Sequence, residues 1–161
     1  MSSDTKIIIG SGLAGPLLAI YLSQRNHNVD LYEKRPDLRV ENISVGRSIN
    51  LALSHRGIKA LQAADVFDKI EPQLIPMKGR MVHLSNGDTE FQPYSIRSNQ
   101  YINSVSRGQL NKILMTRAEA SGKVQIYFNH LLIKLDEYNN DLVFENANRV
   151  HIPNHIFGAH G

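Results

Sequence analysis

The stretch KIIIGSGLAG, residues 6–15, decides the fold of this 161-residue chain. Ile7–Ile9 is a short run of β-branched residues, which is typical of a buried parallel strand. Gly10, Gly12 and Gly15 follow at the spacing G-x-G-x-x-G. In a strand–turn–helix unit the first glycine permits the tight turn, the second lets the backbone approach a pyrophosphate, and the third lets the helix pack on the strand. The stretch therefore predicts a phosphate-binding turn at the start of a helix.

The residues after the turn supply the surroundings that this motif requires. An apolar helical stripe is predicted at Leu17, Leu18, Tyr21 and Leu22, with Pro16 in the first turn. A second strand at 29–32 ends at Glu33, where a carboxylate can accept hydrogen bonds from a ribose. These features predict an α/β, Rossmann-like domain that binds a dinucleotide. An ordinary β-α-β unit with glycine turns is the alternative.

The amino-acid composition limits the classes of protein to which the chain could belong. Hydrophobic residues make up 42% and charged residues 20%, which indicates a globular chain long enough for one domain with a core. The net charge of +3 is spread along the sequence, so nucleic-acid binding is not expected. There is no cysteine for a disulfide or thiolate site, and Pro153 separates His151 from His155, so no metal site is expected. No apolar stretch reaches the length of a membrane-spanning helix or forms a signal peptide.

Local patterns predict the remaining elements. Residues 34–54 are predicted to form a long loop, and Ser106 and Gln109 form a capping box that opens a helix ending near Gly122. A further helix is expected at 55–67 and hairpins around the turns 85–88 and 139–141. Further strands are expected at 101–105, 124–128 and 156–158.

Several segments together resemble one family of proteins. They are residues 10–15, the segment YEKR at 32–35, the run GRSINLALS at 46–54, the segment IPM at 75–77 and the segment SVSR at 104–107. In these segments the chain resembles the kynurenine 3-monooxygenases, a family of flavin-dependent aromatic-ring hydroxylases. The resemblance covers essentially the whole chain, and the run at 46–54 and the segment at 75–80 are its most specific parts.

The resemblance implies bound FAD, NADPH as reductant, O₂ as co-substrate, and 3-hydroxylation of L-kynurenine in tryptophan degradation. It implies that residues 1–161 are the N-terminal FAD-binding region of a longer flavoprotein, with an incomplete antiparallel substrate sheet beginning at about 75–105. The implied location is cytoplasmic, or the mitochondrial outer membrane for a longer eukaryotic relative.

Site residues follow from the motif and from the resemblance. The glycine spacing assigns Gly10, Gly12 and Gly15 to the pyrophosphate. The resemblance assigns FAD contacts to Ala14, Glu33, Arg35, Ala52, Arg107 and Leu132, with Tyr32 and Lys34 in the same segment. The resemblance also places the substrate carboxylate at Arg80 and Tyr94, where a planar guanidinium fork and a hydroxyl would both bond to it. From the residues alone, Arg80 is a solvated arginine on a strand and Tyr94 a half-buried aromatic residue. No general acid or base is expected.

The chain departs from the family in two respects. Family members are much longer, and His160 stands where the family has an aspartate. Apolar hairpin residues such as Phe91 are therefore expected on an uncovered sheet, which predicts marginal stability. Two alternatives remain: a truncated, non-catalytic chain that keeps the dinucleotide-binding fold, and an NAD-dependent dehydrogenase domain, which has the same glycine fingerprint.

Overall fold

The computed structural model describes residues 5–40, 50–96, 101–152 and 155–159. The chain divides into two compact units. The first unit contains residues 1–47 and 110–161, and the second unit contains residues 48–109.

A parallel sheet forms the centre of the first unit. Its strand order is β12 (Ile156–Gly158), β1 (Lys6–Ile9), β2 (Val29–Tyr32) and β8 (Val124–Tyr127). All three strand pairings are parallel, and every residue of β1 is buried. This confirms the predicted β-α-β start and the α/β class, because consecutive parallel strands require a crossover such as a helix.

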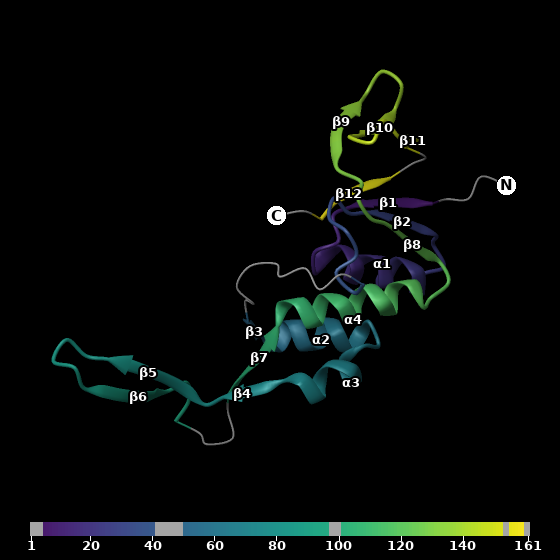
Figure 1. Cartoon of the computed structure of the whole chain (residues 1–161). Coiled ribbons are helices and arrows are strands. Elements are labelled where there is room, and N and C mark those ends of the chain that lie inside the picture. Colours follow the sequence, from purple (N-terminus) through teal and green to yellow (C-terminus); the bar gives the residue numbers. More distant parts are fainter. Residues whose placement is uncertain (1–4, 41–49, 97–100, 153–154, 160–161) are drawn as a thin grey trace. The chain divides into compact units, whose positions relative to one another are not determined.

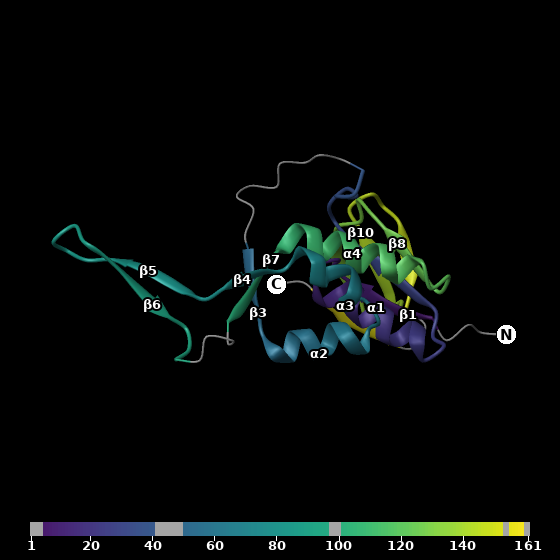
Figure 2. The same cartoon turned by 90° about the horizontal axis from the view of Figure 1, so that it is seen from below.

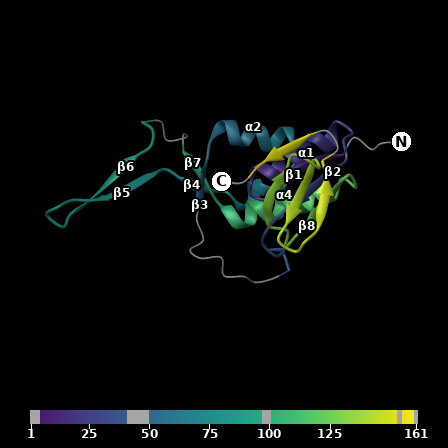
Figure 3. The same cartoon turned by 90° about the horizontal axis from the view of Figure 1, so that it is seen from above.

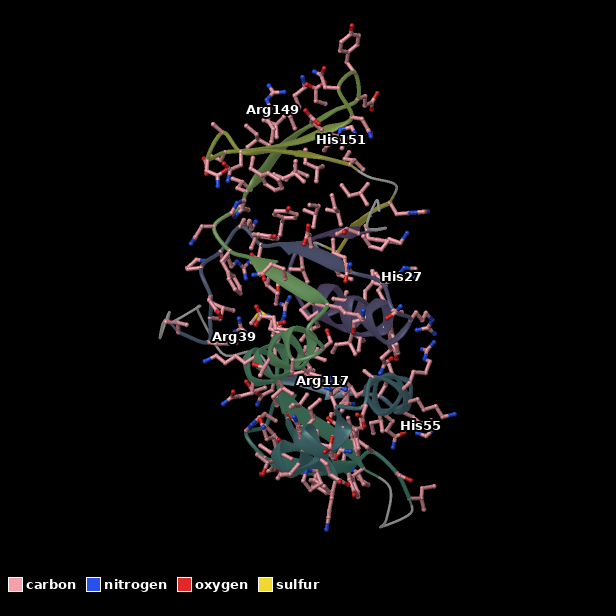
Figure 4. All side chains as sticks on the ribbon, turned by 90° about the vertical axis from the view of Figure 1, so that its right-hand side faces the viewer. His27, Arg39, His55, Arg117, Arg149 and His151 are labelled. Carbon is pink, nitrogen blue, oxygen red and sulfur yellow. The ribbon has the colours of Figure 1, made fainter. Side chains whose placement is uncertain are left out.

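The parallel sheet lies between a second sheet and two helices (Figures 1 and 4). The second sheet is an antiparallel meander of β9 (Leu132–Asp136), β10 (Asp141–Phe144) and β11 (Arg149–His151), seen over the parallel strands in Figure 3. Side chains from both sheets form one core cluster: Ile7, Ile9, Tyr32, Leu142, Phe144 and Ile152. Helices α1 (Ala14–Gln24) and α4 (Arg107–Glu119) lie on the opposite face, although the first three residues of α4 are assigned to the second unit.

Helix α1 buries a different face from the predicted one. Its buried residues are Gly15, Pro16, Ala19, Ile20 and Ser23, whereas the predicted stripe is only half-buried. The prediction of the stripe was wrong because α1 is apolar on nearly all sides, so hydrophobic periodicity does not distinguish its faces. The small side chains on the buried face let the helix approach the sheet closely.

Two elements of the second unit, a strand and a helix, differ from the predictions. Strand β3 (Asn50–Leu53) occupies part of the predicted loop 34–54 and pairs with β7 (Ile102–Ser106). Residues 41–49 lie outside the described part of the chain. Helix α2 (His55–Ala63) ends before the predicted residue 67, because Asp65 has a positive φ of 55°. The remaining elements are α3 (Phe67–Ile70), the 3₁₀ helix η1 (Glu71–Gln73), β4 (Ile75–Met77), β5 (Gly79–His83) and β6 (Thr89–Pro93).

The antiparallel strands of the second unit form two sheets. Strand β7 lies between β3 and β4, whereas β5 and β6 form a separate two-stranded hairpin, drawn as a long ribbon in Figure 2. Gly87, with φ of 91°, occupies the predicted hairpin turn. Phe91 and Met81 face each other across the hairpin and are 53% and 57% exposed. A two-stranded hairpin with such apolar exposure is marginal by itself.

Arg39 connects the segment after β2 to helix α4. Its guanidinium donates to both carboxylate oxygens of Asp37, with Nη2–Oδ2 at 2.7 Å and Nε–Oδ1 at 2.9 Å. It also pairs with Glu119 of α4 and lies over the ring of Phe128. Hydrogen bonding from Arg39 lowers the pKa of Asp37 and outweighs the opposing effect of burial. The residue is labelled in Figure 4.

We expect Asp37→Asn to lower the free energy of unfolding at pH 7 by about 1 kcal/mol, because it weakens a half-buried charged hydrogen-bonding pair. A carboxyl whose pKa is lowered in the folded state stabilises the fold above its unfolded pKa of about 4, and this contribution disappears as the pH falls through the folded pKa. Urea unfolding between pH 3 and 7 should therefore show a difference between variant and parent that shrinks on the acid side. Glu137→Gln, at an exposed turn carboxylate, is the control. A difference that stays constant across this pH range would contradict the assignment.

Candidate functional site

The glycine turn joins β1 to α1 in a conformation that depends on two of its glycines. Gly10 has φ of 106°, and its N–H donates to the Tyr32 carbonyl at 2.8 Å. A Cβ placed on Gly15 would lie 2.0 Å from the Gly10 carbonyl oxygen, so no side chain fits there. The strand end and the helix start are therefore in backbone contact, as the third glycine of the motif requires.

The start of α1 is open to an anion. Among the described residues, no side chain caps this helix, and its first turn has no acidic residue. A Cβ on Gly12 would meet only the Ala159 carbonyl oxygen, at 3.9 Å, so the turn leaves space beside its backbone. Ala14, the first helical residue, is exposed. Free N–H groups and the positive end of the helix dipole suit a phosphate group. The turn therefore fits the pyrophosphate of a dinucleotide.

Glu33 lies beside the glycine turn. Its Oε2 accepts the Ser11 N–H at 2.7 Å, and its Oε1 accepts the Arg35 N–H at 3.0 Å. Backbone hydrogen bonds to Tyr127 and His130 hold Glu33 itself in place. A carboxylate has about four acceptor positions, so two remain for ribose hydroxyls. Sequence position alone predicted this placement, since β1 and β2 are adjacent parallel strands that end at the same edge.

Other predicted cofactor residues have different surroundings. The Tyr32 side chain is buried, its ring stacks on Tyr127 at 4.8 Å, and burial raises its phenol pKa, which keeps it neutral. A contact between Tyr32 and a nucleotide would therefore come from its backbone. Leu132 packs against the same core cluster. Lys34 and Arg35 are exposed directly after Glu33.

The second unit holds the remaining predicted residues. Ala52 is exposed on β3 opposite Ser104, and Arg107 is exposed at the start of α4. Ser106 caps that helix, with its Oγ accepting the Gln109 N–H at 3.4 Å.

Arg80 lies on strand β5, and Tyr94 directly follows strand β6 of the same hairpin. Arg80 is directly opposite Gln92, and its Nε and Nη2 donate to the Gln92 Oε1 at 3.1 and 2.9 Å. Tyr94 is two residues beyond Gln92 and continues the ladder through its N–H to the Lys78 carbonyl. Since Gly79 pairs with Pro93, Arg80 and Tyr94 lie at the same end of the hairpin.

Sequence reasoning missed the contact between Ser11 and Asn111. Both residues are more than nine-tenths buried, and the Asn111 Nδ2 donates to the Ser11 carbonyl at 3.0 Å. The available signal was a polar residue within the buried stripe of α4, next to Leu110 and one turn before Leu114 and Met115.

Comparison with known proteins agrees with this geometry. Residues 8–68 match the NAD(P)-binding Rossmann-like domain family. The chain is similar to kynurenine 3-monooxygenases: it is 43% identical over 141 residues to that of Legionella pneumophila (strain Corby) and 48% identical over 133 residues to that of Myxococcus xanthus. It is 47% identical over 127 residues to the enzyme of Sus scrofa. These matches cover 88%, 83% and 79% of this chain but only 31%, 29% and 27% of the relatives, so the chain spans less than a third of their length.

Solved structures of low sequence identity have the same fold. A tetrameric 2-methyl-3-hydroxypyridine-5-carboxylic acid oxygenase matches 94% of this chain and 38% of its own with a TM-score of 0.71 at 23% identity. The p-nitrophenol 4-monooxygenase of Pseudomonas putida matches 91% of this chain and 38% of its own with a TM-score of 0.66 at 16% identity. The chain therefore has the α/β fold of this group of monooxygenases, with similarity to kynurenine 3-monooxygenases in sequence.

We expect Gly15→Ala to destabilise the chain by roughly 1–3 kcal/mol, the cost of overpacking a closed contact. The added Cβ would overlap the Gly10 carbonyl, and the helix would have to move off the strand. Gly108→Ala is the matched control, since its Cβ meets only Ser106 Oγ, at 3.9 Å. That change should stabilise α4 by roughly 0.5–1 kcal/mol through helix propensity. Equal unfolding midpoints for the two variants in a urea titration would refute the closed contact.

Proposed function

We propose that this chain is the FAD-binding part of a kynurenine 3-monooxygenase, an enzyme that hydroxylates L-kynurenine with NADPH and O₂. The observation that carries the proposal is the open start of α1 beside the Glu33 carboxylate, in a chain 43–48% identical to enzymes of that name. Bound FAD would supply the redox and oxygen chemistry. The residues of this chain would hold the dinucleotide and orient it.

Each part of the adenosine diphosphate moiety has a matching group. The backbone from Gly12 to Ala14 would hold the pyrophosphate, because this turn leaves room beside the backbone and has no side-chain cap among the described residues. Glu33 would accept hydrogen bonds from the ribose hydroxyls. Ala52, Arg107 and Leu132 are further proposed FAD contacts that rest on the resemblance.

The hairpin supports a carboxylate site for kynurenine. Arg80 and Tyr94 lie at the same end of the hairpin, and the Arg80 fork bonds to the neutral amide of Gln92. A carboxylate would be a stronger acceptor than that amide oxygen, because the hydrogen bond would then join opposite charges. We therefore propose Arg80 and Tyr94 as the residues that bind the substrate's amino-acid carboxylate.

A second candidate is binding of NAD(P) at the same turn. The match of residues 8–68 to the NAD(P)-binding Rossmann-like domain favours it. Both cofactors contain the adenosine diphosphate that the turn would hold, so the geometry of this edge does not separate them. Titration of the chain with FAD and with NAD⁺ does: tighter binding of FAD supports the flavoprotein, and tighter binding of NAD⁺ supports the dehydrogenase. No helix in the described ranges is long and apolar enough to cross a membrane.

We expect Glu33→Ala to weaken FAD binding by roughly tenfold or more, because it removes charge-assisted hydrogen bonds to the ribose. Flavin absorbance and fluorescence of the chain titrated with FAD would measure this. The FAD affinity of Glu33→Gln, which keeps an acceptor but removes the charge, should lie between that of the parent and that of the alanine variant. Glu137→Ala, at an exposed position in the β9–β10 turn, is the control. Unchanged FAD affinity in Glu33→Ala would overturn the ribose assignment, and no FAD binding by the parent chain would favour the non-catalytic fragment.

We expect Arg80→Ala, in a protein with the full length of the relatives, to weaken kynurenine binding by roughly 1.5–3 kcal/mol, the range for hydrogen bonds to charged groups. FAD content should hardly change. The measurement is kynurenine-dependent NADPH oxidation together with the flavin absorbance of the purified enzyme. Arg56→Ala, at an exposed position on α2, is the matched control. Loss of FAD with unchanged kynurenine affinity would count against the carboxylate site.

A further inference from the structure

We infer that Asn111 is a positioning residue that fixes the glycine turn so that the Gly12 N–H faces the dinucleotide phosphate. The inference rests on the proposed function, because it concerns the same site. Its basis is one buried hydrogen bond and two buried polar atoms that have no hydrogen-bond partner in the described part of the chain. The hydrogen bond joins α4 to the turn across 100 residues of sequence, from the Asn111 Nδ2 to the Ser11 carbonyl at 3.0 Å.

The direction of the Gly12 N–H follows from the planarity of the peptide bond. The Ser11 carbonyl and the Gly12 N–H belong to one trans peptide, so they point in opposite directions. Because Asn111 holds the carbonyl toward α4, the N–H points away from α4. Gly12 itself is half-buried, and a Cβ on it would meet nothing nearer than the Ala159 carbonyl oxygen, at 3.9 Å. The hydrogen bond therefore orients the Gly12 N–H away from α4, and the proposed pyrophosphate would lie on that side of the turn.

The preceding peptide, between Gly10 and Ser11, is held by Glu33. The Ser11 N–H donates to the Glu33 Oε2 at 2.7 Å. The two peptides on either side of Ser11 are thus held by side chains from different elements, Glu33 after β2 and Asn111 on α4. A turn that contains glycines has much conformational freedom, and two such bonds remove it before a ligand arrives.

The unpartnered atoms indicate that the stability of the fold alone does not account for an asparagine at position 111. Among the described residues, the Asn111 Oδ1 and the Ser11 Oγ are buried and have no hydrogen-bond partner. A buried acceptor without a donor is costly, and an apolar side chain would suit this buried stripe of α4 better. The amide orientation is fixed chemically, because only the Nδ2 side can donate to a carbonyl. Asn111 therefore holds the turn through its Nδ2 donor, whereas its Oδ1 acceptor has no partner among the described residues.

The test compares variants that separate binding from folding. Asn111→Asp keeps the shape but removes the donor, and Asn111→Leu replaces the amide with an apolar group of similar size. Leu114→Ala is the matched control, one turn along the same buried face. We expect both Asn111 variants to bind FAD and ADP at least tenfold more weakly, while adenosine, which lacks phosphate, binds as to the parent. Asn111→Leu removes the unpartnered Oδ1 but also the donor to the Ser11 carbonyl, so its unfolding midpoint should fall less than that of Leu114→Ala, which should lose stability but keep its FAD affinity.

A second readout does not depend on the ligand. In amide-resolved NMR of the chain without FAD, the Ser11 and Gly12 signals should shift in the Asn111 variants and stay in place in Leu114→Ala. Unmoved turn signals in the Asn111 variants would overturn the inference, whether or not FAD binds. Shifted turn signals with unchanged FAD and ADP affinity would also overturn the inference. An equal loss of affinity for ADP and for adenosine would do the same. Failure of the parent chain itself to bind FAD or ADP would overturn the proposed function and, with it, this inference.

Discussion

The contact between the Gly10 carbonyl and the backbone of Gly15 is the constraint on which the site depends. A Cβ on Gly15 would lie only 2.0 Å from the Gly10 carbonyl oxygen, so the helix starts directly against the end of the strand. Helix α1 consequently begins at the carboxyl edge of the parallel sheet, where β2 also ends and Glu33 follows. The N-terminus of α1 and the Glu33 carboxylate thus lie at the same edge of the sheet, because each directly follows one of two adjacent parallel strands. The positive end of the helix dipole and the negative Glu33 can then act on different parts of one ligand.

This edge combines backbone freedom with side-chain restraint. Gly10 adopts a φ of 106°, which residues with side chains rarely adopt, so the turn needs glycine. The same freedom would let the turn sample many conformations. Glu33 and Asn111 limit it by binding the N–H and the carbonyl of Ser11. The contribution of Asn111 requires an amide in the buried face of α4, and its unsatisfied Oδ1 is the energetic cost of that arrangement.

The sequence predicted those features whose signals are local. The strands of the parallel sheet, the glycine turn and the place of Glu33 follow from short apolar runs and fixed spacings, and the structure confirms the strands and the turn. The buried face of α1 was not predictable, because an apolar helix carries no directional signal. Strand β3 was mistaken for loop because its partner β7 lies about 50 residues further along the chain. The contact of Asn111 with Ser11 depends likewise on packing between distant segments, so the sequence shows a polar residue in the buried face of α4 but not its partner.

The hairpin shows how a local turn can determine a proposed binding site. Leu84 and Asp88 close the turn through the Leu84 N–H and the Asp88 carbonyl at 2.8 Å, and this sets Arg80 opposite Gln92. Because side chains alternate along a strand, a slip of one residue would move Gln92 to the face opposite Arg80. The two faces also differ chemically, since Phe91 lies on the other one and packs over Gly79, where a Cβ would come within 2.5 Å of its ring. The packing of Phe91 over Gly79 and the pairing of Arg80 with Gln92 belong to the same register, so the apolar face of the hairpin helps to maintain the geometry of its polar face.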